Sequence, residues 1–122
     1  MTRSIALAWP AGAERTRTAR RLLSSGHELH LFELGESVAR LRDVAIDAVV
    51  VRIGPTPWLG LAVLEALCRA GRFVIAVAPH ARPWLWTEAR DLGAARVIDE
   101  TVCANGIAES IAGLAGSAGL AG

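Results

Sequence analysis

The chain has 122 residues, with 13 basic and 12 acidic side chains and a formal net charge of +1. This length fits one domain, and 52% hydrophobic against 20% charged residues exclude a disordered chain. All the basic residues are arginine, so the sequence excludes chemistry that needs a Schiff-base or P-loop lysine.

Short apolar runs alternate with amphipathic stretches in the first half of the chain. The runs 5–9 and 29–32 are typical of strands. Apolar residues at helical spacing predict helices over 14–24 and 37–44. The residues expected to face the core from these helices are Ala19, Leu22, Leu23, Val38, Leu41 and Val44.

The second half continues the alternation. The run 47–53 is apolar up to Arg52, which is typical of a strand covered by helices on both faces of a parallel sheet. Further strands are predicted over 73–77 and 96–98, and helices over 58–70, 82–92 and 105–114. We expect Leu59, Ala62, Val63, Ala66 and Leu67 to face the core from the first of these helices, and Leu85, Ala89 and Leu92 from the second.

Five strand–helix units in succession predict an α/β fold, a doubly wound parallel sheet of the flavodoxin-like type with strand order 2-1-3-4-5. The expected domain is 1–114. The tail 115–122, composed of Ala, Gly, Ser and Leu, is expected to be a flexible end or linker.

Several classes of partner are not expected. A net charge near zero argues against nucleic-acid binding. The arginines of the first helix, at positions 15, 17, 20 and 21, favour a solvated face over a phosphate-binding one. No run reaches the roughly 18 apolar residues of a membrane span. Cys68 and Cys103 are too few for a disulfide framework or a metal site, so a reducing cytoplasm is expected.

At this point the sequence resembles a family, the response-regulator receiver domains, over about residues 4–114. The run 47–53 is similar to the family's third strand, which ends in a phosphorylated aspartate. Gly60 lies where the family has a glycine after the following loop, and 91–98 resembles its Gly-Ala turn into the last strand. The first helix end, 22–29, also has a family-like sequence.

The departures from the family pattern fall on the residues of its chemistry. The Mg²⁺-binding acidic pair falls on Trp9 and Pro10, and the phosphoacceptor falls on Arg52. The Thr or Ser that ends strand four falls on Ala78, and the lysine of strand five falls on Glu100. The resemblance therefore implies a degenerate form, a pseudo-receiver, with no hard-cation site and no cofactor.

The charges at the ends of strands three and five are exchanged relative to the family. The family has an acid and then a base; here the residues are Arg52 and Glu100. We expect an ion pair across the pocket, while the alternative is two independent charges at the edge of the sheet.

Other chemistry is not favoured. The loop 9–14 lacks the G-x-G-x-x-G spacing and the P-loop lysine of nucleotide sites. His27, His30 and His80 are scattered, no serine lies in a nucleophile-elbow pattern, and nothing marks Cys103 as an activated thiolate. No enzymatic activity is expected, and Cys68 is expected to be a small core residue.

Four tryptophans stand beside two phenylalanines and no tyrosine. Trp9 and Trp58 are expected to fill the space left by the missing acidic residues. Trp84 and Trp86 cannot both share the inward face of their helix, so at least one is expected to project outward. An alternative is that both pack over loop residues as a local cap.

The favoured function is a phosphorylation-independent protein-interaction module in signalling. Its surface would comprise Trp84 and Trp86, with Arg90 and Arg96 as polar contacts. In the family this face, formed here by helix 82–92, strand 96–98 and helix 105–114, is the usual partner and dimer surface, so a protein partner or a homodimer is expected. The alternative is a small-molecule or anion sensor with a pocket around Trp9, Arg52, Trp58, His80 and Glu100. The bias toward Arg, Ala and Gly suggests a bacterial source.

Overall fold

A computed structural model describes residues 3–42, 44–54, 56–102, 106–107 and 109–111. The strands are Ser4–Ala8 (β1), Glu28–Phe32 (β2), Ala48–Arg52 (β3), Val74–Ala78 (β4) and Arg96–Asp99 (β5). The α-helices are Ala13–Ser24 (α1), Ser37–Arg40 (α2), Pro57–Arg69 (α3) and Pro83–Asp91 (α4). Short 3₁₀ turns cover Leu34–Glu36 (η1) and Glu100–Val102 (η2). Residues 106–107 and 109–111 are also helical.

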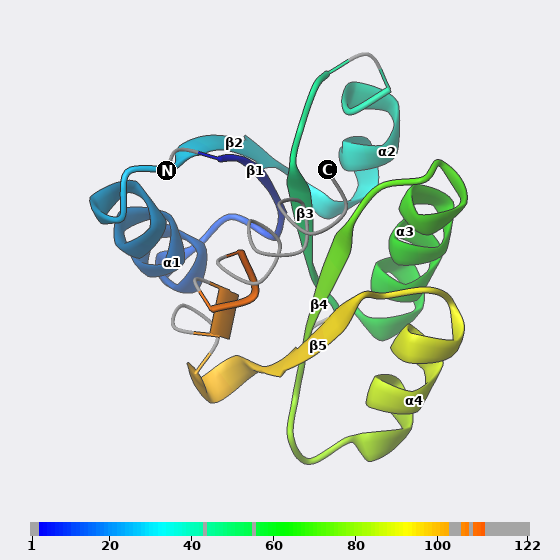
Figure 1. The fold of residues 1–122 in the computed structure, drawn as a ribbon. Helices are drawn as coiled ribbons and strands as arrows, with labels where there is room; N and C mark the ends of the chain where they lie inside the picture. The colour runs from blue at the N-terminus through cyan, green and yellow to red at the C-terminus, as the bar shows by residue number, and fades with distance from the viewer. Residues whose placement is uncertain (1–2, 43, 55, 103–105, 108, 112–122) are drawn as a thin grey trace.

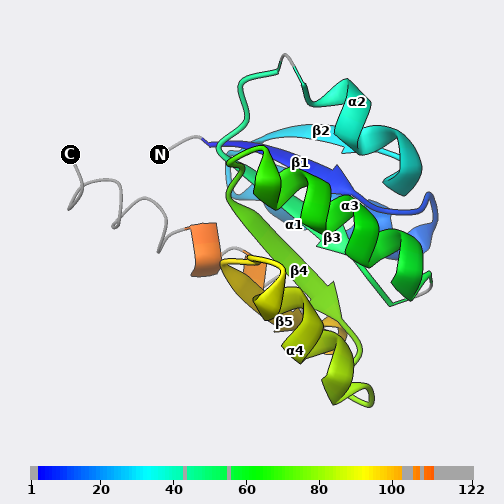
Figure 2. The same ribbon diagram turned by 90° about the vertical axis from the view of Figure 1, so that its right-hand side faces the viewer.

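The strands form one parallel sheet in the order β2-β1-β3-β4-β5, which confirms the predicted topology. Helices α2, α3 and α4 cover one face of the sheet, and α1 covers the other (Figures 1 and 2). β1, β3 and β4 are apolar along nearly their whole length because both faces of these central strands are buried.

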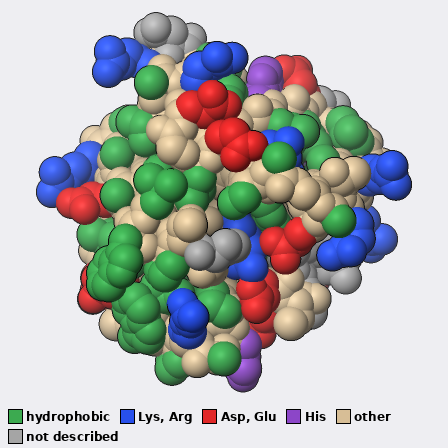
Figure 3. Space-filling view, turned by 180° about the vertical axis from the view of Figure 1, so that it is seen from behind, with side chains coloured by type: hydrophobic (Ala, Val, Ile, Leu, Met, Phe, Trp, Pro, Cys, Tyr) green, Lys and Arg blue, Asp and Glu red, His purple; other side chains and the backbone are tan. Residues whose placement is uncertain are grey.

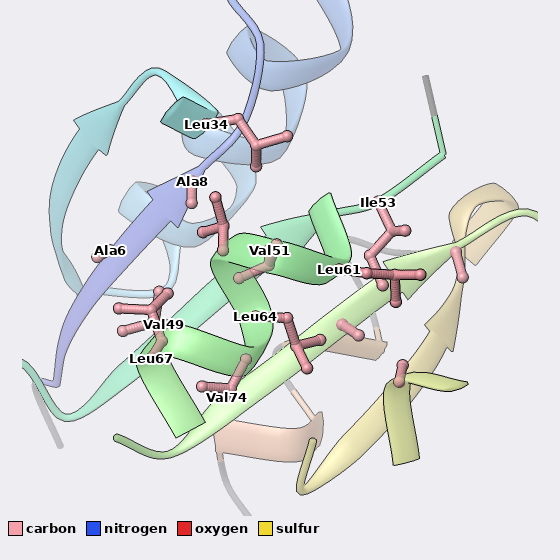
Figure 4. Close-up of a cluster of buried hydrophobic side chains, with 14 of the residues drawn as sticks. Ala6, Ala8, Leu34, Val49, Val51, Ile53, Leu61, Leu64, Leu67 and Val74 are labelled. Atoms are coloured by element: carbon pink, nitrogen blue, oxygen red, sulfur yellow. The ribbon is translucent and has the colours of Figure 1, made fainter. Parts of the chain in front are cut away.

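Two hydrophobic clusters lie on opposite faces of the sheet. Beneath α3, Leu64 and Leu67 pack with Val49, Val51 and Val74 of the central strands (Figure 4). The second cluster joins α1 to the residues after β5 and comprises Ile5, Leu7, Trp9, Ala19, Leu22, Ala48, Val50, Ile75, Val77, Ile98, Ile107 and Ile111. Each side of the sheet therefore has its own packed core.

Some predicted core positions are wrong. Leu23 is exposed, and Thr18 is buried on α1 in its place. The second helix ends at Arg40 rather than 44, and Val38 is exposed. On α3, Leu59 and Ala62 face solvent, whereas Leu61 and Leu64 face the core. The predicted inward residues of α4, Leu85, Ala89 and Leu92, do contact the core.

The tail 115–122 and the boundary at 114 lie outside the described residues, as does Cys103. Among the helices of the described part of the chain, none is both long and apolar enough to cross a membrane.

Candidate functional site at the carboxyl edge of the sheet

Four neighbouring strands end at one edge of the sheet and bring the predicted site residues to that edge. Trp9 follows β1, Arg52 ends β3, Ala78 ends β4 and Glu100 follows β5. Because β1, β3, β4 and β5 are adjacent and parallel, their carboxyl ends lie side by side. This is the edge at which open α/β sheets bind ligands.

Arg52 is the centre of this edge and is only 5% exposed. Its Nη2 atom donates to Glu100 Oε2, so the ion pair expected from the sequence is present. Its Nε atom donates to Glu14 Oε1 at 2.8 Å. One buried guanidinium thus holds carboxylates from α1 and from the turn after β5, and it ties both segments to the end of β3.

Trp9 completes the cluster and is 1% exposed. Its indole Nε1 donates to Glu14 Oε1 at 3.1 Å, so one carboxylate oxygen accepts from both Trp9 and Arg52. The Arg52 Cζ atom lies 6.0 Å from the centre of the Trp9 ring, within the range of a cation–π contact. Trp9 therefore fills the space beside the guanidinium with an aromatic ring.

The prediction that Trp58 also fills this space is wrong. Its side chain is 76% exposed, because it lies in the first turn of α3 on the side away from the core. His80 does not contact Arg52 either, and it pairs with Asp99 instead. Of the residues expected around the pocket, the structure brings together Trp9, Arg52 and Glu100.

Glu14 is the site residue that the sequence analysis missed. It stands in the first turn of α1, where a carboxylate also interacts favourably with the helix dipole. The sequence did contain a signal for it. Glu14 is the first acidic residue after β1, and it lies in the helix instead of at Trp9 or Pro10, where the family pattern has its acidic pair. A side chain from that turn reaches back to the end of β3.

The charges of the cluster set what it can bind. Among the described residues, the guanidinium hydrogen-bonds to two carboxylates, so the local sum is one positive and two negative charges. Arg52 Nη1 is buried and has no hydrogen-bond partner among the described residues. Within the same part of the chain, no group of three or more His, Cys, Asp or Glu side chains is placed to hold a metal ion.

Gly54 shows how closely the chain wraps around Arg52. A Cβ atom at Gly54 would lie 2.4 Å from Arg52 Nη1, far inside van der Waals contact. A glycine is therefore required two residues after the arginine if the guanidinium is to keep this position. The loop after β3 and the buried cation are packed as one unit.

A second polar group borders the cluster at the end of β5. Asp99 Oδ1 accepts from the backbone N–H and the hydroxyl of Thr101, each at 3.0 Å, and Oδ2 lies 3.3 Å from His80 Nδ1. These contacts lower the pKa of the Asp99 carboxyl, with the backbone hydrogen bond from Thr101 as the largest cause. Asp99 therefore remains ionised to lower pH than an ordinary aspartate.

An exposed aromatic surface lies beside this edge. Trp84 on α4 is 44% exposed and its ring centre lies 5.7 Å from that of Trp58 on α3, with the rings tilted at 43°. Leu59, the residue after Trp58 in the sequence, is also exposed. We call Trp58, Leu59 and Trp84 the aromatic patch. Figure 3 looks onto this edge, and hydrophobic side chains gather at its lower left, on the side of α3 and α4.

Trp86 differs from Trp84, as expected for two residues on different faces of one helix. It is half-buried, packs against the α3–α4 core, and its indole Nε1 donates to the Pro79 carbonyl at 3.1 Å. Arg90 and Arg96 are exposed, the first on α4 and the second at the start of β5. The structure thus brings Trp84 together with Trp58 and places Trp86 and Arg90 on the other flank of α4.

Cys68 is half-buried on α3, where it touches the core side of the helix, and burial raises the pKa of its thiol. A raised pKa disfavours the thiolate, the reactive form. This placement agrees with the expected role as a small packing residue.

Comparisons of the sequence with protein-family models and with curated proteins find no match. Solved structures give clear matches. A CheY-like response regulator receiver domain protein from Methanospirillum hungatei JF-1 superimposes with a TM-score of 0.84 at 21% identity, covering 100% of both chains.

Two further structures are similar. The signal receiver domain of a modulated diguanylate cyclase from Desulfovibrio desulfuricans G20 gives a TM-score of 0.83 at 15% identity, with 100% of both chains covered. NtrX from Brucella abortus, in complex with ADP, gives 0.82 at 22% identity, covering 98% of this chain and 28% of that one. At these identities the likeness establishes the fold: this chain has the fold of response-regulator receiver domains.

Proposed function

We propose that the chain is a pseudo-receiver: a signalling module that works without phosphorylation and without catalysis, and acts by binding other proteins. The observation that carries the proposal is the Arg52 guanidinium at the end of β3, buried and bonded to Glu14 and Glu100. The resemblance puts a phosphoacceptor carboxylate at this position. An arginine held by two carboxylates can neither accept a phosphoryl group nor coordinate Mg²⁺.

Binding of other proteins is supported by the side chains around α4. The aromatic patch exposes two tryptophans whose rings contact each other. Trp86 and Arg90 lie on α4, and Arg96 begins the following strand, β5. Tryptophan and arginine are enriched among the residues that dominate binding energy at interfaces.

The expectation of a bacterial cytoplasm rests on the sequence alone.

The alternative, an anion sensor built on Arg52, has less support. The guanidinium is 5% exposed, and a bound anion would have to displace Glu14 or Glu100. Trp9 occupies the space beside it. The buried Arg52 Nη1, which has no hydrogen-bond partner among the described residues, is an observation in favour of this alternative.

Treatment with a phosphoryl donor tests the first half of the proposal. The full chain is incubated with Mg²⁺ and acetyl phosphate for intact mass measurement, and with Mg²⁺ and beryllofluoride for thermal unfolding. We expect no phosphoryl adduct and an unchanged midpoint, because a ligand of the folded state would raise the midpoint by linkage. A receiver domain with an intact acidic site is the positive control. An adduct, or a rise with Mg²⁺ and beryllofluoride together, contradicts the proposal.

Site-specific photo-crosslinking in cells of the source organism tests the second half. A photoreactive amino acid replaces Trp84 in one variant and Arg20, an exposed residue of α1, in the control. We expect a discrete protein adduct from position 84 and none from position 20, and an adduct of twice the chain mass would identify a homodimer. Absence of an adduct at 84, or the same adduct at both positions, contradicts an interface at α4.

A further inference from the structure

A groove lies on a different flank of α4 from the aromatic patch. Its volume is about 390 Å³, and it is lined by His80 in the loop after β4 and by Pro83, Trp86, Thr87 and Arg90 of α4. The volume falls within the roughly 300–1,000 Å³ of binding sites for small groups. The groove is distinct from the Arg52 cluster, since the two share no residue.

The helix sets the order of chemical groups along the groove. Positions 83, 86, 87 and 90 follow the spacing i, i+3, i+4 and i+7, so they form one stripe on the surface of α4. Pro83 and Trp86 make the stripe apolar at one end, and Arg90 makes it cationic at the other. One helical turn, about 6 Å, separates Trp86 from Arg90 along the axis.

The apolar end is rigid. The Trp86 indole donates to the Pro79 carbonyl at 3.1 Å and packs against the core, which fixes the plane of the ring. Pro83 contributes a ring of limited conformational freedom. A surface that is already ordered loses little side-chain entropy when a partner binds.

The cationic end is free to bind. Arg90 is exposed, and its guanidinium has no hydrogen-bond or ion-pair partner among the described residues. No carboxylate is found among the described residues that line the groove. Glu88 and Asp91 share a different stripe of α4 with Trp84, roughly a third of a turn around the helix axis from the groove.

We propose that this groove binds an acidic segment of a partner protein, in which an apolar side chain rests on Trp86 and Pro83 and a neighbouring carboxylate pairs with Arg90. A guanidinium binds a carboxylate through two parallel hydrogen bonds, which gives direction as well as attraction. The groove lies on the same helix as the aromatic patch, so a segment that crosses the start of α4 contacts both. This inference rests on the proposed function and adds the chemistry of the partner.

A peptide titration tests the proposal. The ¹⁵N-labelled full chain is titrated with the capped peptide Leu-Phe-Asp-Glu and with its uncharged isostere Leu-Phe-Asn-Gln, and the Trp86 indole N–H signal is followed by NMR. We expect saturable shifts of this signal and of residues 83–90. The acidic peptide should bind at least about fivefold more tightly, because a charge-assisted hydrogen bond is stronger than a neutral one, and added salt should reduce this advantage.

Two arginine variants localise the effect. Arg90→Gln should abolish the advantage of the acidic peptide, whereas Arg96→Gln, at an exposed arginine outside the groove, should retain it. The proposal is overturned by an absence of saturable shifts, by equal binding of both peptides, or by equal losses in the two variants. It is also overturned if free N-acetyl-phenylalanine binds as tightly as the peptide, which would indicate a small-molecule site.

The proposed function can survive failure of this test. A partner cross-linked through position 84 would still identify α4 as an interface, and only the acidic chemistry of the groove would be wrong. Conversely, formation of a phosphoryl adduct would refute the pseudo-receiver without changing the peptide result.

Discussion

Burial of a single guanidinium at the end of β3 is costly, and the two carboxylates explain why it is tolerated. The Arg52 side chain is 6% exposed, whereas the side chains of Glu14 and Glu100 are 41% and 33% exposed. The arginine therefore depends on its partners for the solvation it has lost, while each glutamate retains contact with water. Because of this asymmetry, removing the two carboxylates should lower the free energy of unfolding more than removing the arginine.

The double variant Glu14→Gln with Glu100→Gln should lower the free energy of unfolding by about 3 kcal/mol, because it leaves a buried charge without an opposite charge. Arg52→Met should cost about 1 kcal/mol or less, since an apolar side chain fills the site and both carboxylates can hydrate. Urea unfolding of the three proteins measures the difference. If Arg52→Met is as damaging as the double variant, the cluster does not stabilise the chain in the way described.

Gly54 provides an independent test of the position of the guanidinium. Gly54→Ala should destabilise the protein by about 1–2 kcal/mol, because the new Cβ would force Arg52 Nη1 out of place. In an Arg52→Ala background the same change should cost almost nothing, so a double-mutant cycle should give a coupling energy of similar size. Additive effects in the urea-unfolding cycle would show that the two residues do not touch.

The Asp99 carboxyl provides a prediction about pH. Its pKa lies below the ordinary 3.8, first because of the Thr101 N–H, and also because of the Thr101 hydroxyl and His80. Thr101→Val removes the hydroxyl alone, so the pKa should rise but remain below 3.8. Because the folded-state pKa is depressed, the stabilisation is present above 3.8 and is lost as pH falls through the folded value. Carboxyl chemical shifts followed by NMR during acid titration measure the Asp99 pKa in the native chain and in the variant. A native pKa at or above 3.8 would contradict the prediction.

At the scale of the helix, α3 shows what the sequence could and could not predict. Its extent was predicted to within one residue at each end, but its inward face was partly wrong. The segment is apolar on several sides, so more than one stripe satisfies a helical period. The choice between them is made by tertiary contact: Gly60 lies against the backbone of Ile53, and this contact turns Leu61 and Leu64 inward.

Gly60→Ala should therefore be disruptive. A Cβ at this position would lie 2.8 Å from the Ile53 Cα atom, and backbone cannot move aside as a side-chain end can. We expect a loss of about 2 kcal/mol in the free energy of unfolding, within the range for overpacked sites. Gly35→Ala is the matched control, since a Cβ there meets no atom within 4 Å, and it should change stability by less than about 0.5 kcal/mol. Equal thermal midpoints for the two variants would contradict the close approach.

The candidate site was predictable where strand ends alone place residues, and unpredictable where a helix contributes. Arg52 ends β3 and Glu100 follows β5, with β4 between these two strands, and their pairing was expected from the exchanged charges at the two strand ends that the family pattern pairs. Glu14 reaches the same guanidinium from the first turn of α1, and the path of the preceding loop decides whether it can do so. Trp58 was misplaced for the same reason, because the rotation of α3 directs it to solvent.

At the scale of the molecule, the sheet separates two cores and gives the strands unequal protection. All residues of β3 and β4 are buried, whereas β5 has exposed and half-buried positions at the edge of the sheet. Amides of central strands exchange with solvent only through global unfolding, while edge strands open locally at lower free energy. The ion pair between Glu100 and Arg52 ties the end of that edge strand to the centre of the sheet.

Amide hydrogen exchange should therefore show a hierarchy that a single side chain controls. In the native chain, β3 and β4 should exchange most slowly and β5 faster. Glu100→Gln weakens the tie between η2 and Arg52, so amides of β5 and η2 should exchange about three- to tenfold faster, equivalent to a loss of about 0.6–1.4 kcal/mol in local stability. At the opposite edge, the exchange rates of the β2 amides should increase only as much as the loss of global stability requires. Uniform acceleration in β2 and β5 would show that Glu100 supports the fold as a whole. Acceleration confined to β5 would instead give the Arg52 cluster a mechanical role, holding the α4–β5 side in one arrangement without a phosphoryl group.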